Sequence, residues 1–233
     1  IVGYNVQAAV DTKHHLIVAH EVTNVGHDRA QLSNMALQAK EAIACEELAV
    51  VADRGYFNGE EILACEEASI TAYVPKTQTS NNQARGLFGR RDFIYRADDN
   101  EYECPAGERL IYRFTTQDKG KTVHRYWSSA CPRCRLKKQC TTAVYRRVKR
   151  WEHEAVMEAM EDRVDRMPDC MRIRGSTVEH PFGTIKSWMG PVHFLMRRLE
   201  HVSTEMSLHV LSYNLKRMLQ MFGVGPLIAA IRG

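Results

Sequence analysis

The sequence contains no apolar run approaching 18 residues and no charged-then-apolar pattern of the kind found in signal peptides. The first absence excludes a membrane-spanning helix, and the second excludes a secretory signal peptide. No internal repeat is visible. We therefore expect a soluble, cytoplasmic protein whose 233 residues form one domain, or one domain with an insertion. Because the chain starts at Ile1, inside a strand-like pattern, we interpret it as a fragment of a longer protein.

Acidic residues are missing from one long stretch of the chain. Lys and Arg exceed Asp and Glu by only four overall, a mildly basic balance. Between Arg133 and Arg150, however, there are eight basic residues and no acidic one. Such a block is typical either of a solvated face or of a surface that contacts a polyanion.

Hydrophobic patterns in the first third of the chain predict a mixed α/β arrangement. Alternating or continuous apolar residues predict strands at residues 2–10, 16–19, 48–52 and 70–74. The first two strands are expected to form an antiparallel hairpin. Two helices are expected between the strands. Asp28 is predicted to cap the first, with Gln31 completing a capping box, and the second should span 58–68.

The middle of the chain has a different pattern from its two ends. It is short-segmented and rich in aromatic residues, without a long periodic helix, which indicates an inserted subdomain. Helical periodicity returns near Trp151, and a long terminal helix is expected to be capped by Ser203. The predicted divisions are a first core segment at 1–75, an insertion at 76–149 and a helical second core segment at 150–233.

Asp53 follows the continuously apolar strand predicted at 48–52. A carboxylate at the carboxyl end of a buried strand lies where open α/β sheets place their chemistry. The alternative is a turn role, because Asp before Gly also favours a turn.

Glu179 is the single carboxylate of an otherwise uncharged stretch, and Lys186 follows seven residues later. Seven helical residues make nearly two turns, so both side chains are expected on one helix face. Pro181 limits the helix and places Glu179 either in its opening turn, capped by Ser176 or Thr177, or beside a kink. For such a pair taken alone, a surface role is the more common one.

Four of the seven cysteines cluster in the middle of the chain. They are Cys104, Cys131, Cys134 and Cys140. Cys131 and Cys134 form a C-x-x-C unit, and four thiolates suit tetrahedral Zn²⁺, which would stabilise a subdomain poor in apolar sequence. Because the first segment, Cys104-Pro-Ala-Gly, contributes one cysteine rather than two, four reduced thiols without a metal are the alternative. Disulfides are not expected in a chain without a leader.

Four motifs together resemble bacterial insertion-sequence transposases of the DDE type. The motifs are Gly3-Tyr-Asn-Val-Gln-Ala-Ala-Val-Asp11, Val51-Ala-Asp-Arg-Gly-Tyr56, Cys104-Pro-Ala-Gly107 and Val178-Glu-His-Pro-Phe-Gly-Thr-Ile-Lys186. The resemblance extends from residue 3 to about residue 222, and its last motif is the most specific. It implies a ribonuclease-H-like mixed sheet flanked by helices, here with a cysteine-rich, zinc-ribbon-like insertion.

The resemblance also implies a catalytic site in which two Asp and one Glu hold two Mg²⁺ or Mn²⁺ ions. Asp53 matches the second Asp, Glu179 the Glu, and Lys186 the lysine that contacts DNA phosphate. Arg174 is one residue away from the position of the family's arginine. The first Asp is expected upstream of Ile1, and Asp11, in the hairpin turn, is its only rival in the chain.

Three functions are compatible with these observations. The first is a DNA-strand-transfer enzyme, inactive as this fragment; the second is a non-catalytic DNA-binding remnant; the third is a metal-dependent nuclease of the same fold. Double-stranded DNA is the expected partner in the bacterial nucleoid, with a homodimer in the synaptic complex and no membrane. The residues expected to contact DNA are Arg146, Arg147, Lys149, Arg150, Arg174, Lys186, Arg197 and Arg198.

Overall fold

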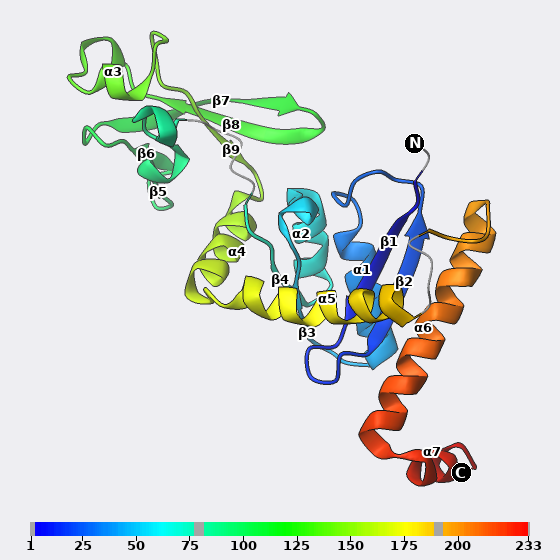
Figure 1. Cartoon of the computed structure of the whole chain (residues 1–233). Helices are drawn as coiled ribbons and strands as arrows, with labels where there is room; N and C mark the ends of the chain where they lie inside the picture. The colour runs from blue at the N-terminus through cyan, green and yellow to red at the C-terminus, as the bar shows by residue number, and fades with distance from the viewer. Residues whose placement is uncertain (1–2, 77–81, 189–192, 233) are drawn as a thin grey trace. The chain divides into compact units, whose positions relative to one another are not determined.

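The computed structural model describes residues 3–76, 82–188 and 193–232 (Figure 1). The chain divides into two compact units. The first unit combines residues 1–77 with residues 156–233, and the second unit consists of residues 78–155. The assignment of 1–75, 76–149 and 150–233 as domains stays a prediction.

The first unit contains two small sheets. Strands β1 (Asn5–Val10) and β2 (Ile17–Thr23) pair antiparallel, as the hairpin prediction required. Strands β3 (Leu48–Val51) and β4 (Ile70–Tyr73) pair parallel. A parallel pair needs a crossover connection, and here helix α2 (Gly59–Glu67) supplies it. The fold of this unit is therefore mixed α/β.

The helices of this part begin differently from one another. Helix α2 starts where it was expected, and the Asn58 side chain caps it by accepting the N–H of Glu60. Helix α1 (Leu32–Ile43) has Gln31 at its N-cap position, without a side-chain cap bond. The predicted capping role of Asp28 is therefore wrong. The carboxylate of Asp28 accepts side-chain amides from β1 instead.

The remaining helices follow one another along the second half of the chain (Figure 1). They are α4 (Glu154–Arg166), α5 (Cys170–Trp188), α6 (Leu199–Phe222) and α7 (Val224–Arg232). Helix α5 continues through Pro181, whose side chain is buried, so Glu179 lies inside the helix and not in its opening turn. Helix α6 starts before Ser203, which therefore does not cap it.

The core of the first unit joins β2, α5 and α6. Its buried members are Ile17, Val22, Ile185, Val202, Met206, Val210 and Tyr213. Asn214 fixes α6 to the edge of β2, because its side chain accepts the N–H of Ile17 at 3.0 Å and donates to the Ile17 carbonyl at 2.8 Å. Helix α5 also packs against β1 and β3. This packing places one helix across both small sheets.

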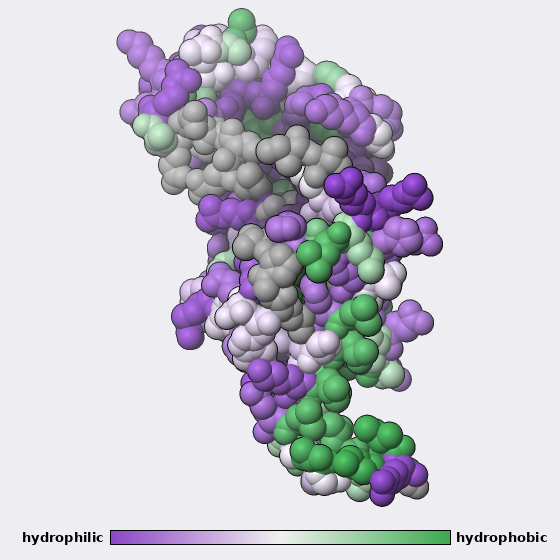
Figure 2. All heavy atoms as spheres, turned by 45° about the vertical axis from the view of Figure 1, so that its right-hand side comes forward, coloured by the Kyte–Doolittle hydropathy of each residue, from purple (hydrophilic) through white to green (hydrophobic). Residues whose placement is uncertain are grey.

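The outer face of the last two helices is apolar (Figure 2). Exposed large side chains there are Leu208, Leu211, Leu215, Phe222, Val224, Ile228 and Ile231. Of the apolar residues of α6, Leu208, Leu211, Leu215 and Phe222 are thus exposed, whereas Met206 is buried at 3 % exposure. Within the described residues no helix is both long and apolar enough to cross a membrane.

The second unit is built on a five-stranded antiparallel sheet. Its strands are β5 (Ile94–Arg96), β6 (Glu101–Glu103), β7 (Arg109–Asp118), β8 (Lys121–Trp127) and β9 (Val148–Trp151), in that spatial order. An aromatic core that includes Phe93, Tyr102 and Tyr126 packs on this sheet. Trp151 belongs to β9, so α4 begins three residues later than its periodicity suggested. The short helix α3 (Lys137–Cys140) carries the last cysteine of the cluster.

Candidate active site and cysteine cavity

A cavity of about 520 Å³ opens in the first unit. Strands β1 and β3 line it along their whole lengths, and helices α1 and α5 complete its walls. Asp53, Glu179 and Lys186 all line this cavity. Asp53 and Glu179, which are separated by 125 intervening residues, therefore line one cavity. Their catalytic role stays a prediction.

Asp53 has the turn role that was the alternative for its position, and it also pairs with a basic side chain. Its Oδ1 atom accepts the N–H of Gly55 at 2.8 Å and starts the single 3₁₀ turn Arg54–Tyr56. Its Oδ2 atom accepts from a guanidinium nitrogen of Arg174 at 2.7 Å. Arg174 comes from α5, little more than one turn before Glu179. One carboxylate therefore links the end of β3 to the helix that carries Glu179.

Asp28 is a residue of this cavity that sequence reasoning missed. Its Oδ1 atom accepts amide N–H groups from Asn5 and from Gln7, each at 2.7 Å. Gln7 is 1 % exposed and accepts in turn the hydroxyl of Tyr56. The signal in the sequence was the pair of amide side chains two residues apart, which a strand places on one face.

Tyr56 lies close to the carboxylates of Asp28 and Asp53. Burial, followed by the negative charges of Asp28 and Asp53, raises the pKa of Tyr56 to about 12, against the opposing effect of Arg174. The phenol therefore stays protonated at neutral pH and can act as a hydrogen-bond donor. The polar side chains of Asp28, Gln7, Tyr56 and Asp53 in the cavity are thus linked to one another rather than isolated.

Glu179 and Lys186 lie on the same face of α5, as two helical turns require. Glu179 is exposed, and a Cβ atom added to Gly175 would lie 3.8 Å from its Oε1 atom. The adjacent His180 does not line the cavity. Its Nδ1 atom lies 3.1 Å from the Tyr213 hydroxyl of α6.

Two further residues predicted to contact DNA lie in the first unit. Arg197 and Arg198 are exposed at the start of α6. The segment before them is held by Glu205, which is 7 % exposed and accepts the backbone N–H groups of Leu195 and Met196 at 3.0 and 2.9 Å. A buried carboxylate thus fixes the position from which both arginines extend.

The second unit's basic residues predicted to contact DNA differ in how exposed they are. Arg147 and Lys149 are exposed, the former over the ring of Trp127 and the latter in an ion pair with Asp118 at 2.8 Å. Arg146 is half-buried, with its guanidinium 5.1 Å from the centre of the Phe93 ring.

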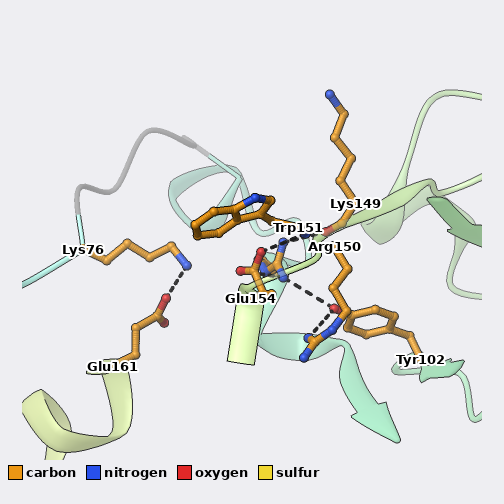
Figure 3. A network of polar contacts seen from close by, with 8 residues as sticks. Lys76, Tyr102, Lys149, Arg150, Trp151, Glu154 and Glu161 are labelled. Atoms are coloured by element: carbon orange, nitrogen blue, oxygen red, sulfur yellow. Dashed lines mark hydrogen bonds and ion pairs between the residues drawn. The ribbon is translucent and has the colours of Figure 1, made fainter. Parts of the chain in front are cut away.

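Arg150 does not fit the prediction that it contacts DNA. Its side chain is 8 % exposed, donates to the hydroxyl of Tyr102 at 3.2 Å and stacks 3.6 Å from the centre of the Tyr95 ring. Figure 3 shows Arg150 turned toward Tyr102, whereas Lys149 extends away from both. Because its guanidinium packs against aromatic rings, Arg150 is a core residue of the second unit, and its contact with DNA stays a prediction that its burial does not favour. Figure 3 also shows the ion pair of Lys76 and Glu161, which belongs to the first unit.

All four clustered cysteines line one small cavity of about 20 Å³ in the second unit. Two tight turns present three of them: the N–H of Gly107 donates to the Cys104 carbonyl at 2.8 Å, and that of Cys134 to the Cys131 carbonyl at 3.3 Å. Burial raises the pKa of Cys140, and the other three thiols raise it further against the effect of Arg146.

Neither cavity has the geometry of a closed metal site. Among the described residues, no group of three or more His, Cys, Asp or Glu side chains is arranged to hold a metal ion. The binding of zinc by the four cysteines therefore stays a prediction. The types of side chain nevertheless suit the predicted metals. The large cavity offers carboxylate oxygens, which suit Mg²⁺, and the small one offers thiols. Arg174 places a positive charge at the Asp53 carboxylate.

A strand-end Asp and a helical Glu that line one cavity, with basic side chains nearby, are compatible with metal-assisted chemistry on phosphodiesters. Comparison with known families is in agreement. The chain belongs to the transposase DDE domain family, whose family model matches residues 1–215. The family consists of enzymes that catalyse DNA transposition, and the resemblance drawn from the motifs is confirmed. Searches among curated proteins and among solved structures found no significant match.

Proposed function

We propose that this chain is the catalytic domain of a DNA transposase that hydrolyses phosphodiesters and joins DNA strands with the help of divalent cations. The observation that carries the proposal is the shared cavity of Asp53 and Glu179, with Lys186 on the same helix face as Glu179. The partner would be double-stranded DNA in the bacterial nucleoid, bound by two copies of the chain in a synaptic complex.

The finer fold that we propose is ribonuclease-H-like. In that fold a further strand carries the first catalytic Asp. This strand precedes the hairpin in sequence but lies in the sheet between the hairpin and the next parallel strand. The cavity supports this assignment, because it runs along all of β1 and all of β3. Asp11 is a weaker candidate for the first Asp. Its carboxylate accepts the N–H groups of Lys13 and His14, which is the bonding of a turn residue.

Asp53 and Glu179 would hold the Mg²⁺ or Mn²⁺ ions. When bound, such ions would activate the attacking oxygen and stabilise the leaving oxygen of the phosphodiester. Arg174 already neutralises Asp53 at 2.7 Å, so cation binding has to displace or share this guanidinium. Lys186 would bind a DNA phosphate beside the carboxylates, and the exposed Arg197 and Arg198 would extend the phosphate contacts.

The test is strand transfer of pre-nicked transposon-end DNA with Mg²⁺ or Mn²⁺, by this chain and by one extended upstream. We expect joining by the extended chain and none by the present one. Asp53→Asn and Glu179→Gln in the extended chain should each lower the rate at least about 1,000-fold, because each removes a metal ligand. The exposed Glu67→Gln serves as the matched control.

Other outcomes of the same assay favour the alternatives. Cutting without joining indicates a nuclease, and DNA binding without cutting in either chain indicates a non-catalytic remnant. Activity of the present chain that Asp11→Ala abolishes would identify Asp11 as the first Asp.

We also propose that Cys104, Cys131, Cys134 and Cys140 bind one structural Zn²⁺. Support comes from their common cavity and from the turns at Cys104 and Cys131. Stoichiometric zinc in gently purified protein is expected, with four thiols protected from alkylation until a chelator is added. Free alkylation of all four without chelator would contradict this site. Cys45 supplies the control thiol, because it lies outside the cysteine cavity.

A further inference from the structure

The side chains of Asp28 and Asp53 face each other across a glycine. A Cβ atom added to Gly55 would lie 3.0 Å from Oδ1 of Asp53 and 3.3 Å from Oδ2 of Asp28. The φ angle of Gly55 is not among the positive ones, so its backbone conformation does not require glycine. A larger residue at position 55 would therefore mainly fill the space between the two carboxylates.

The carboxylate of Asp28 is oriented by its neighbours. Its Oδ1 atom accepts both amides from β1, from Asn5 and Gln7, at 2.7 Å each. The Oδ2 atom is the one on the side of Gly55 and Asp53. Gln7 is itself held by the hydroxyl of Tyr56, within the turn that Asp53 starts. Three side chains thus fix one carboxylate and direct its second oxygen toward the other carboxylate.

This arrangement is expensive without a cation. Two nearby carboxylates place two negative charges on one side of the cavity, and a positive charge beside them reduces their mutual repulsion. Arg174 binds Oδ2 of Asp53, on the other oxygen from the one that faces Gly55. Both carboxylates, and Glu179, line the same cavity.

We propose that Asp28 is an additional carboxylate of the divalent-cation site, acting through Oδ2 beside Asp53, and that Gly55 keeps the space between them open. The inference rests on the proposed function, because that function implies the cations. It adds a residue that the family motifs matched in this sequence do not include, and it assigns Asn5 and Gln7 the role of orienting it.

The test is direct Mn²⁺ binding, measured by the loss of the free-ion electron paramagnetic resonance signal in titrations of the full chain. Asp28→Asn should weaken binding about 10-fold or more, the range typical of residues that support a metal site. It keeps an oxygen that can accept from Asn5 and Gln7. Gly55→Ala should also weaken binding, because its methyl group would lie between the carboxylates.

Matched variants make the outcomes separable. Gly26→Ala, in the same loop as Asp28, is the control, since its added Cβ atom would meet nothing within 4 Å. Circular dichroism checks folding of each variant, and if Asp28→Asn does not fold, Gly55→Ala alone decides the question. Weaker Mn²⁺ binding by Asp53→Asn but unchanged binding by Asp28→Asn and Gly55→Ala would overturn this inference and leave the proposed function intact. Unchanged binding by all three would overturn both.

Discussion

The two units use charged side chains in different ways. In the first unit, Asp53 and Arg174 form an ion pair that remains 40 % and 26 % exposed at the edge of a large cavity. In the second unit, Arg150 is enclosed by Tyr95 and Tyr102 and is only 8 % exposed. A charged side chain can therefore contact a ligand only where its neighbours leave it exposed to solvent. Aromatic neighbours turn an arginine into a core residue.

The largest expected difference between the units is in stability. Arg150→Ala should lower the free energy of unfolding of the second unit by about 3 kcal/mol, because it removes a buried charged hydrogen bond and a close cation–π contact. Asp53→Asn should change the stability of the first unit little, since that carboxylate is partly solvated. Urea unfolding followed by tryptophan fluorescence measures both.

Lys149→Ala is the matched control for Arg150, one residue away in β9 but exposed. We expect it to leave stability nearly unchanged. Equal destabilisation by the two variants would contradict the assignment of Arg150 to the core.

The salt dependence of DNA binding should show which basic residues contact DNA phosphate. Each lost phosphate contact should reduce the slope of log affinity against log salt by about 0.9. Single alanine variants of Lys186, Arg197, Arg198 and Arg147 should show this reduction, measured by fluorescence anisotropy at several salt concentrations. A slope that is the same in all four variants as in the unchanged chain would contradict the phosphate contacts.

The smallest expected effect is a loss of stability in mild acid. Burial lowers the pKa of His180, and the charges of His15 and Arg217 lower it further. The unfolded state therefore takes up a proton near pH 6.5 that the folded state resists, so this contribution is full above pH 6.5 and is lost as the pH falls through the folded pKa. Burial lowers the pKa of His20 in the same direction.

Unfolding in urea at pH 7.5 and pH 5.5 measures the effect of both histidines. The double variant His20→Gln, His180→Gln should lose less stability between these pH values than the unchanged chain. A larger loss in the double variant would contradict the sign of the effect.

The sequence predicted well those elements that are encoded locally. Strand alternation predicted the hairpin of β1 and β2, and the start of α2 next to Asn58 was also predicted, because both depend on neighbours a few residues away. The helix at Glu179 was predicted less well. Pro181 suggested a helix start nearby, whereas tertiary packing buries this proline inside α5.

The candidate site was predictable only where motifs marked it. Asp53 and Glu179 were found as a strand-end Asp and a lone helical Glu, and they do line one cavity. Asp28 was missed because Asp before a helix usually caps it, while the partners that orient it, Asn5 and Gln7, lie more than 20 residues earlier. Similarly, the burial of Arg150 depends on tyrosines from β5 and β6, which a count of basic residues does not include.

Asp53 and Glu179 are proposed to hold the same divalent cations. The most direct measurement is the anomalous scattering of Mn²⁺ in crystals of the chain grown with the ion. The account predicts a peak in the cavity between β3 and α5, within about 2.0–2.3 Å of oxygens from both carboxylates. A fully occupied Mn²⁺ bound elsewhere, with Asp53 still paired to Arg174 and Glu179 in solvent, would contradict it.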